Sequence, residues 1–193
     1  MKSKKINIEI AGIKYELPAE ALRTKDYWGK EIEPTIYARG PIAGSLVKQF
    51  VKAKYPKVVC SVKSSSFANG NSLDVYVSYP NGDEVESNIF SEINAFANQF
   101  EYGKYNGWDE TYDFYENSGC KTNKGTIVEA GVKYVHVNNR PSFGTTPDVV
   151  RMLKAMMAGE YVWGKISLEE AIMRVKTYKV SESNINKALP YLA

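Results

Sequence analysis

The middle third of the chain alternates between two kinds of hydrophobic periodicity, and this alternation limits the possible folds more than any other feature. Apolar residues at helical spacing predict amphipathic helices over 43–55 and 85–99. Between them, apolar runs and strict alternation predict strands over 58–63 and 72–79, joined by a polar loop at 64–71. Because each element must bury its apolar side, the pattern predicts helices packed on a small sheet.

Two hairpin patterns flank this block. Alternating apolar residues on either side of Ala11-Gly12 predict an N-terminal hairpin. Residues 19–41 mix charges with prolines, and we expect loops and one helical turn there. A second hairpin is predicted around Gly131, with arms at 126–130 and 132–137.

The C-terminal part is predicted to be helical. Thr146 is expected to cap a first helix, and Ser167 and Ser181 to cap two more. The fold class that follows is α+β: a small, mostly antiparallel sheet with packed helices and a C-terminal three-helix unit. The chain is expected to divide into an α+β domain at 1–145 and a helical subdomain at 146–193.

Length and cysteine content suggest an intracellular globular protein. No apolar run reaches the roughly 18 residues of a membrane-spanning helix, and no signal-peptide core follows the N-terminus. Cys60 and Cys120 could form one disulfide but no framework, and we expect two free thiols. The expected location is the cytoplasm of a bacterial host.

No catalytic or metal-binding set can be assembled from the residues that carry chemistry. The one histidine, His136, lies at an alternating strand position, where a structural role is more common. No metal-ligand spacing and no phosphate-binding glycine loop is present, and capping explains the threonines before residue 147 without an anion. We therefore expect no catalytic residue, no metal and no cofactor, and a binding function rather than an enzyme.

Charge is spread unevenly along the chain, although the net charge is only +3. Residues 83–116 hold nine acidic residues and one lysine, and aromatic residues interleave with the acids after residue 100. Such a segment can present anchors and negative charge to a basic groove on another protein. Alternatively, the aromatic residues complete the core and the acids only solvate the surface. The candidate partner-binding residues of this acidic-aromatic segment are Glu101, Tyr102, Tyr105, Trp108, Asp109, Glu110, Tyr112 and Asp113.

A second candidate surface is basic. The polar face of the helix over 43–55 carries lysines, and more lysines follow in the next strand. Such a row can follow a phosphate backbone, although a solvated helix face has the same pattern. The candidate nucleic-acid-binding residues here are Lys48, Lys52, Lys54, Lys57 and Lys63.

A third candidate lies at the C-terminus. Residues 180–189 resemble the turn and second helix of a bacterial helix-turn-helix module. Val175 stands where a small alanine is usual, and Lys179 stands where glycine usually makes the turn. The helix that would enter the DNA groove carries one basic residue, Lys187. A plain helical bundle is therefore the preferred interpretation.

Four pieces of sequence in the block from Ile42 to Glu116 together match a known pattern. They are the helix Leu46–Pro56, the strands Lys57–Lys63 and Gly70–Val77, and the closing run Asn106–Phe114. In this order they resemble the large polyvalent protein-associated domain family of phages and conjugative elements. The resemblance implies a mobile-element origin and an accessory or counter-defence role.

We accordingly expect a non-catalytic phage or mobile-element accessory protein. It would bind a host nucleic-acid-handling or defence complex partly through the acidic-aromatic segment, as an anti-CRISPR or anti-restriction-like inhibitor does. The expected partner is a host protein or ribonucleoprotein complex, without membrane association. The alternative is direct binding of DNA or RNA through the basic helix or the helix-turn-helix-like C-terminus.

Overall fold

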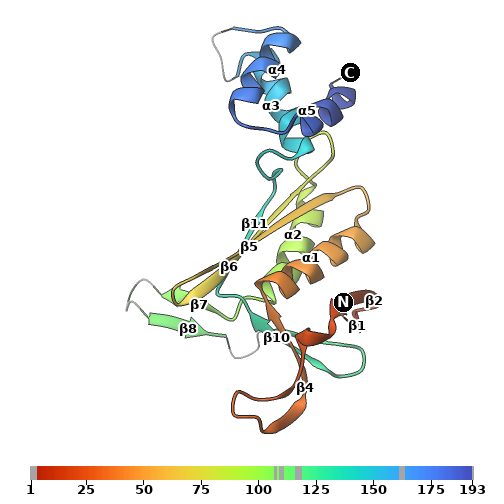
Figure 1. The fold of residues 1–193 in the computed structure, drawn as a ribbon, viewed down its shortest axis with the longest axis vertical. Coiled ribbons are helices and arrows are strands. Elements are labelled where there is room, and N and C mark those ends of the chain that lie inside the picture. Colours follow the sequence, from red (N-terminus) through yellow and green to blue (C-terminus); the bar gives the residue numbers. More distant parts are fainter. Residues whose placement is uncertain (1–3, 107, 109–110, 116–118, 161–163, 193) are drawn as a thin grey trace.

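The computed structural model describes residues 4–192 except 107, 109–110, 116–118 and 161–163. In this part of the chain the fold is α+β, as predicted, with five α-helices and several small sheets instead of one. Three parts follow one another along the long axis of the molecule in Figure 1: a helical unit, a central sheet covered by two helices, and a group of smaller sheets.

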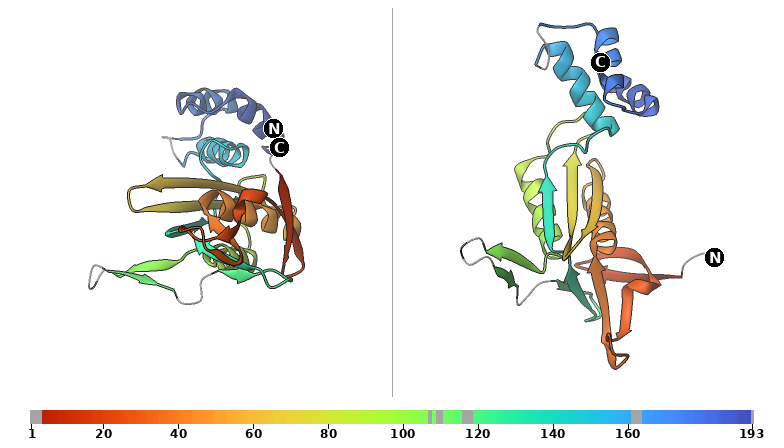
Figure 2. Two further views of the ribbon diagram at one scale, coloured as in Figure 1. Left: turned by 60° about the horizontal axis from the view of Figure 1, so that its bottom comes forward. Right: turned by 60° about the vertical axis from the view of Figure 1, so that its left-hand side comes forward.

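The central part is a three-stranded sheet with helices on one face only (Figure 2). The strand order is β11-β6-β5, with β5 and β6 antiparallel and β6 and β11 parallel. Side chains of β6 that point toward the helices, Leu73, Val75 and Val77, are fully buried. The elements are α1 (Gly40–Lys54), β5 (Val59–Phe67), β6 (Gly70–Ser78), α2 (Ser87–Asn98) and β11 (Tyr134–Asn138).

The predicted helices and the strand over 72–79 are confirmed, but the predicted loop at 64–71 is wrong. Strands β5 and β6 continue through it to a two-residue turn, where Asn69 has a φ of +67°. Most side chains of this stretch are exposed. Because the end of the hairpin reaches water on both sides, it needs no apolar alternation, and its polar sequence looked like a loop.

Two of the smaller sheets are the N-terminal hairpin and a four-stranded sheet. The hairpin around Ala11-Gly12 is confirmed, as β1 (Lys5–Ile10) and β2 (Ile13–Pro18). The expected helical turn is the 3₁₀ helix at Ala19–Ala21, and a loop is present at 26–30, but the rest of 19–41 forms strands and the start of α1. The four-stranded sheet has the order β3-β4-β10-β9, formed by β3 (Leu22–Lys25), β4 (Glu31–Arg39), β9 (Cys120–Lys121) and β10 (Ile127–Gly131).

The predicted hairpin around Gly131 is also wrong. Its two arms are strands, but β10 pairs in parallel with β4 and β11 pairs in parallel with β6, so that they belong to different sheets. Between them the buried Val132 exchanges backbone hydrogen bonds with Phe100 and Tyr102. Alternation identified the strands correctly, but it carries no information on which strand each one pairs with.

The C-terminal part has its own hydrophobic cluster, which includes Val150, Leu153 and Ile185. The Ser167 and Ser181 caps are confirmed, since each side chain accepts a hydrogen bond from a backbone N–H three residues later. The N-cap of the first helix is one residue earlier than predicted. The helices are α3 (Thr146–Ala158), α4 (Leu168–Thr177) and α5 (Glu182–Ala188). The domain division at residue 145 stays a prediction, which separate expression of the two parts would test.

No helix in the described ranges combines the length and the apolar character needed to cross a membrane. Both cysteines are free thiols, as predicted, and both are half-buried.

Lys179 is strained, and this gives a prediction about stability. It joins α4 to α5 with a φ of +57°, a left-handed conformation that costs an L-residue about 1 kcal/mol. Lys179→Gly should therefore raise the free energy of unfolding by about 0.5–1 kcal/mol in urea denaturation. The matched control is Lys154→Gly on the exposed side of α3, which should lower it by about 1 kcal/mol. A loss of stability in both variants would contradict the prediction.

The two half-buried thiols lead to the prediction that the protein loses stability at alkaline pH. Burial raises the pKa of Cys60 to about 12 and that of Cys120 to about 11, from a usual value of 9.0. The thiols of the unfolded chain ionise first, so their contribution to stability is complete below pH 9 and is lost as the pH rises through 11–12. The urea midpoint of the native chain should fall more steeply above pH 9 than that of a Cys60→Ala/Cys120→Ala variant. Parallel curves would contradict this.

Candidate functional site: an aromatic surface beside the open sheet face

A short hairpin projects from the central part of the molecule (Figure 1). It consists of β7 (Gly103–Asn106) and β8 (Thr111–Phe114), paired antiparallel. Gly103 is required at its base, because a Cβ there would lie 2.4 Å from Cε1 of Tyr112. The missing side chain lets the Tyr112 ring cross the partner strand and turn toward β11.

Side chains and backbone fix the base of this hairpin to the segment that begins β11. The Tyr112 hydroxyl donates a hydrogen bond to the Lys133 carbonyl at 2.7 Å, and burial raises the pKa of Tyr112. Glu101 accepts a hydrogen bond from the Val135 N–H at 3.1 Å. The Tyr102 N–H donates to the Val132 carbonyl at 2.9 Å. The hairpin therefore leaves the body in a defined direction.

Aromatic rings continue from the hairpin onto the sheet. Tyr102 and Phe114 are nearly parallel, with centroids 5.9 Å apart, and the Tyr112 ring packs edge-on against both. Tyr112 also meets Tyr134 of β11 edge-on at 6.2 Å. On the sheet, Tyr134 is nearly parallel to two further rings. We call this set the aromatic surface: Phe67, Tyr102, Tyr112, Phe114, Tyr134 and His136.

The rings on the sheet owe their arrangement to strand register and to one glycine. Tyr134 and His136 are two residues apart on β11 and therefore project from the same face, with planes 9° apart and centroids 6.5 Å apart. Phe67 comes from the end of β5 and lies 6.2 Å from Tyr134. A Cβ at Gly70 would lie 2.8 Å from the Phe67 ring, so the glycine makes room for that ring.

The rest of the open face is polar. Asp74 of β6 pairs directly with His136 on one side and with Lys63 on the other, and these three side chains form one row across the sheet. The Lys133 ammonium lies 4.9 Å from the centroid of Tyr112 and 5.5 Å from that of Tyr134. Among the described residues, no group of three or more His, Cys, Asp or Glu is placed to hold a metal ion.

The structure divides the residues of the acidic-aromatic segment into two groups. Glu101, Tyr102 and Tyr112 are half-buried and hold the hairpin in place, which is closer to the core-sealing alternative. Trp108 is fully exposed and Tyr105 is 50% exposed, as a partner-binding role requires. Asp113 is exposed and lies opposite Lys104 in the pairing of β7 with β8. Asp109 and Glu110 lie outside the described residues.

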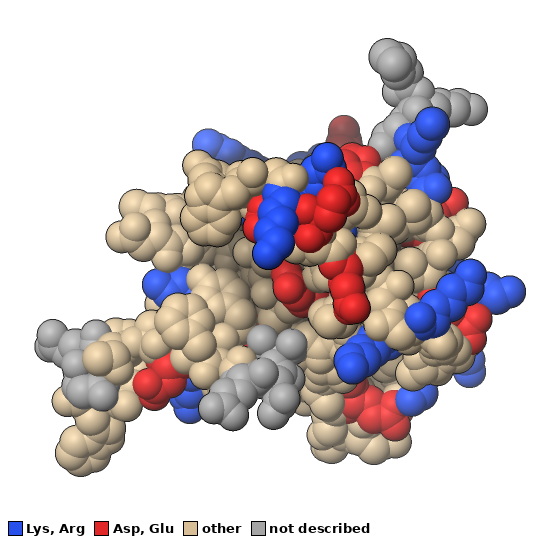
Figure 3. Space-filling view, turned by 90° about the horizontal axis from the view of Figure 1, so that it is seen from below, with Lys and Arg blue, Asp and Glu red and all other residues tan. Residues whose placement is uncertain are grey.

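The β7–β8 hairpin has few charged side chains in its described part. In the space-filling view from below (Figure 3), it shows mostly uncharged atoms, and acidic and basic side chains are interspersed over the rest of that face. The surplus of acids along the sequence is therefore not a single acidic patch on the described part of this face. Exposed aromatic side chains are the dominant feature of the hairpin.

The predicted basic residues do not form one surface. Lys48 and Lys52 are exposed on α1, and Lys54 is paired with Glu92 of α2. Lys63 projects from the opposite face of the sheet, because its neighbours Val62 and Ser64 are the ones that contact α1. Lys57 is exposed in the turn before β5.

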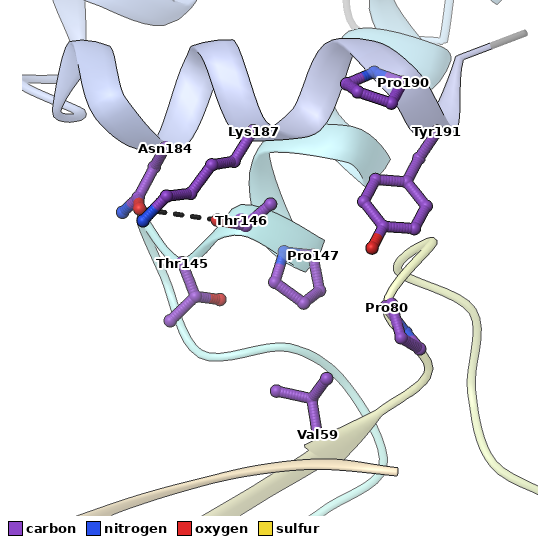
Figure 4. Close-up of a pocket in the computed structure, with 9 residues that line it drawn as sticks. All are labelled: Val59, Pro80, Thr145, Thr146, Pro147, Asn184, Lys187, Pro190 and Tyr191. Carbon is purple, nitrogen blue, oxygen red and sulfur yellow. Dashed lines mark hydrogen bonds between the residues drawn. The ribbon is translucent and has the colours of Figure 1, made fainter. Parts of the chain in front are cut away.

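Lys187 is far along the chain from these lysines and lines a cleft. The cleft holds about 750 Å³ and lies between the C-terminal helices and one end of the central sheet. Figure 4 shows Lys187 and Asn184 on the side of α5 that faces Val59 and Pro80. Asn184 also donates a hydrogen bond to the Gly144 carbonyl at 2.7 Å. Lys187 is exposed, but Asn184 is bonded to the loop before α3 and is not presented outward as a DNA-reading side chain must be, which favours the plain helical bundle.

The part of the aromatic surface that lies on the sheet was not among the predicted site residues. Tyr134 and His136 alternate with the apolar Val135, which is buried, and Val137, which is half-buried, and this alternation alone could have placed both rings on the face away from the core. Phe67 carried no such signal, because its stretch of chain looked like a loop. Lys133 precedes the strand and gave no pattern either.

Comparison with known proteins gives one match. The family model described as large polyvalent protein associated domain 29 matches residues 40–142. These residues include α1, the central sheet, α2, the hairpin and all of the aromatic surface. No curated protein and no solved structure matches the chain.

The hydroxyl of Tyr112 is predicted to stabilise the hairpin base. Tyr112→Phe removes the donor to the Lys133 carbonyl and should lower the free energy of unfolding by about 1 kcal/mol. Tyr105→Phe, at a half-exposed position of the same hairpin, is the control and should change it by less than about 0.5 kcal/mol. Urea denaturation measures both. Equal stabilities for the two variants would show that the bond has no role in anchoring.

Proposed function

Because the chain belongs to the large polyvalent protein associated domain 29 family, which is associated with phages and mobile elements, we propose that it is a mobile-element accessory protein that acts by binding. Its partner in this proposal is a host nucleic-acid-handling or defence complex, and its action is inhibitory. The contact is made by the exposed side chains of the β7–β8 hairpin. The family is not a known catalytic one, and the proposed role requires no catalysis.

One observation carries this proposal: Trp108 is fully exposed at the tip of a hairpin whose base is fixed. Phe114 and Tyr105 of the same hairpin are 74% and 50% exposed. Trp and Tyr are the residue types that contribute most to protein–protein binding, because they bury a large area for few rotatable bonds. Single exposed aromatic residues are ordinary, but three on one projecting hairpin make a compact set of anchors.

The fixed base adds to the argument. A loop that must become ordered on binding loses part of its interaction energy to that ordering. The bonds of Tyr112 and Glu101 hold the hairpin direction before any partner arrives. The exposed rings are therefore preorganised for insertion into a pocket of the partner.

Charge supports the choice of partner. Asp113 is exposed on the hairpin opposite Lys104, and Asp109 and Glu110 follow Trp108 directly in the sequence. Proteins that handle nucleic acid have basic grooves, so acids around an aromatic anchor would direct the hairpin toward such a groove and disfavour acidic surfaces. Blocking a basic groove is a direct route to inhibition.

Trp108→Ala should abolish capture of the partner. The tagged native protein would be used to recover a stoichiometric partner from nuclease-treated lysate of the bacterial host, and the purified partner would then be titrated with each variant. Loss of a central Trp anchor should weaken binding by about 30-fold or more, equivalent to about 2 kcal/mol.

Tyr178→Ala is the matched control for this titration. It removes an exposed ring from the C-terminal unit, where Tyr178 is 52% exposed, and should leave binding unchanged. If Trp108→Ala binds the partner as tightly as the native chain, the hairpin is not the contact. A partner that disappears from the eluate after nuclease treatment would contradict direct protein–protein binding.

A further inference from the structure

The central sheet has one face that no helix or other sheet of the described chain covers, apart from the Tyr112 ring of the hairpin against Tyr134. Helices α1 and α2 lie together on the other face, and the view in the right half of Figure 2 looks straight onto the uncovered one. The hairpin stands at one border of this open face, and the helical unit lies beyond the end of the strands. The side chains that the three strands place on this face are half-buried or exposed, and none is fully buried.

The side chains on the open face combine aromatic rings with small polar and charged groups. Their rows follow from the register: Tyr134 with Ser72 and Ser65, then His136 with Asp74 and Lys63, then Asn138 with Tyr76 and Ser61. Aromatic rings thus alternate with hydroxyl, amide and ammonium groups. Phe67 at the hairpin end is 47% exposed and extends the rings toward the edge strand.

We propose that this open face binds single-stranded nucleic acid, with bases stacking on Tyr134, His136 and Phe67. The three rings are close to parallel, at 9° and 18° to the central one, so they offer a succession of π-faces at spacings of 6.5 and 6.2 Å. Stacking on aromatic side chains of a sheet is how single strands are held without a fixed sequence. This site differs from the hairpin contact and goes beyond it.

Two lysine side chains lie on the same part of the molecule as the rings, where they can contact the phosphate backbone of a bound single strand. Lys133 lies next to Tyr134 and Tyr112, with its ammonium also held by the Asn69 carbonyl at 3.1 Å. Lys63 lies in the row of His136 on the edge strand. Asp74 lies between them and is half-buried. The two lysines can contact phosphates on either side of the rings, while the hydroxyl and amide groups can bond to base edges.

Two other occupants fit the face less well. A protein partner would need a continuous apolar core on the face, and in the three rows each ring lies beside hydroxyl, amide or charged side chains instead. Duplex DNA keeps its bases stacked inside the helix, so their faces cannot reach these rings. The combination of separate rings, hydrogen-bonding groups and two cations therefore matches unpaired bases.

The test is a fluorescence anisotropy titration with labelled single-stranded DNA, single-stranded RNA and a duplex of the same sequence. The native protein should bind at least one single strand more tightly than the duplex. A Tyr134→Ala/His136→Ala variant should bind it about tenfold to a hundredfold more weakly. The exposed-ring control Tyr178→Ala should bind like the native protein, and thermal unfolding checks that each variant is folded.

A second variant separates stacking from charge. Lys63→Ala should weaken binding at low salt and reduce the slope of log affinity against log salt by about 0.7, the value for one phosphate of a single strand. It should leave the preference for single strand over duplex intact. A 2′-hydroxyl contact would appear as tighter binding of RNA than of DNA, whereas stacking alone gives similar affinities.

Three results would overturn the proposal. The first is that neither single strand binds at about 10⁻⁴ M, a concentration at which nucleic-acid-binding proteins already bind non-specifically. The second is equal affinity for duplex and single strand. The third is unchanged affinity in the Tyr134→Ala/His136→Ala variant. Trp108→Ala separates this proposal from the hairpin contact, because it should keep oligonucleotide binding while losing the protein partner.

Discussion

The packing of α1 and α2 on the same face of the central sheet determines the rest of the structure. Leu46 and Val47 of α1 and Ile93 of α2 are completely buried in one cluster with Leu73 and Val75 of β6. Burial of side chains of this size is worth roughly 1.5–3 kcal/mol each, so no arrangement that leaves that face exposed can compete. Since a strand projects side chains alternately to both faces, covering one face completely leaves the other free for binding.

Features that depend on neighbouring residues could be predicted from the sequence. The two amphipathic helices, the N-terminal hairpin and the Ser167 and Ser181 caps follow from periodicity or from contacts within a few residues, and the structure confirms them. The pairing of strands that are distant in the sequence could not be predicted. The parallel pairs of β10 with β4 and of β11 with β6 join segments separated by dozens of residues, and an alternating strand fits many partners equally well.

The candidate site shows the same limit. The composition of the hairpin segment pointed to aromatic anchors, but it could not show that Tyr112 and Glu101 hold the hairpin while Trp108 stays exposed. The basic surface failed for a related reason. Lys52 belongs to helix α1 and Lys63 to strand β5, which packs against that helix. Side chains alternate between the two faces along β5, and Lys63 is on the face away from α1. Charges that are neighbours in sequence thus end on opposite sides of the sheet.

The two proposed contacts share strand β11 and are physically joined. Tyr112 bonds to the Lys133 carbonyl and packs edge-on against Tyr134, so the residue that orients the hairpin also borders the stacking rings. Tyr112 is therefore the side chain through which binding at one contact would affect the other. A ribonucleoprotein would bring both chemistries at once, with its protein part on Trp108 and its unpaired bases on the open face. Contacts that are modest separately would then act as one bivalent attachment, whose strength depends on the rigid connection through β11.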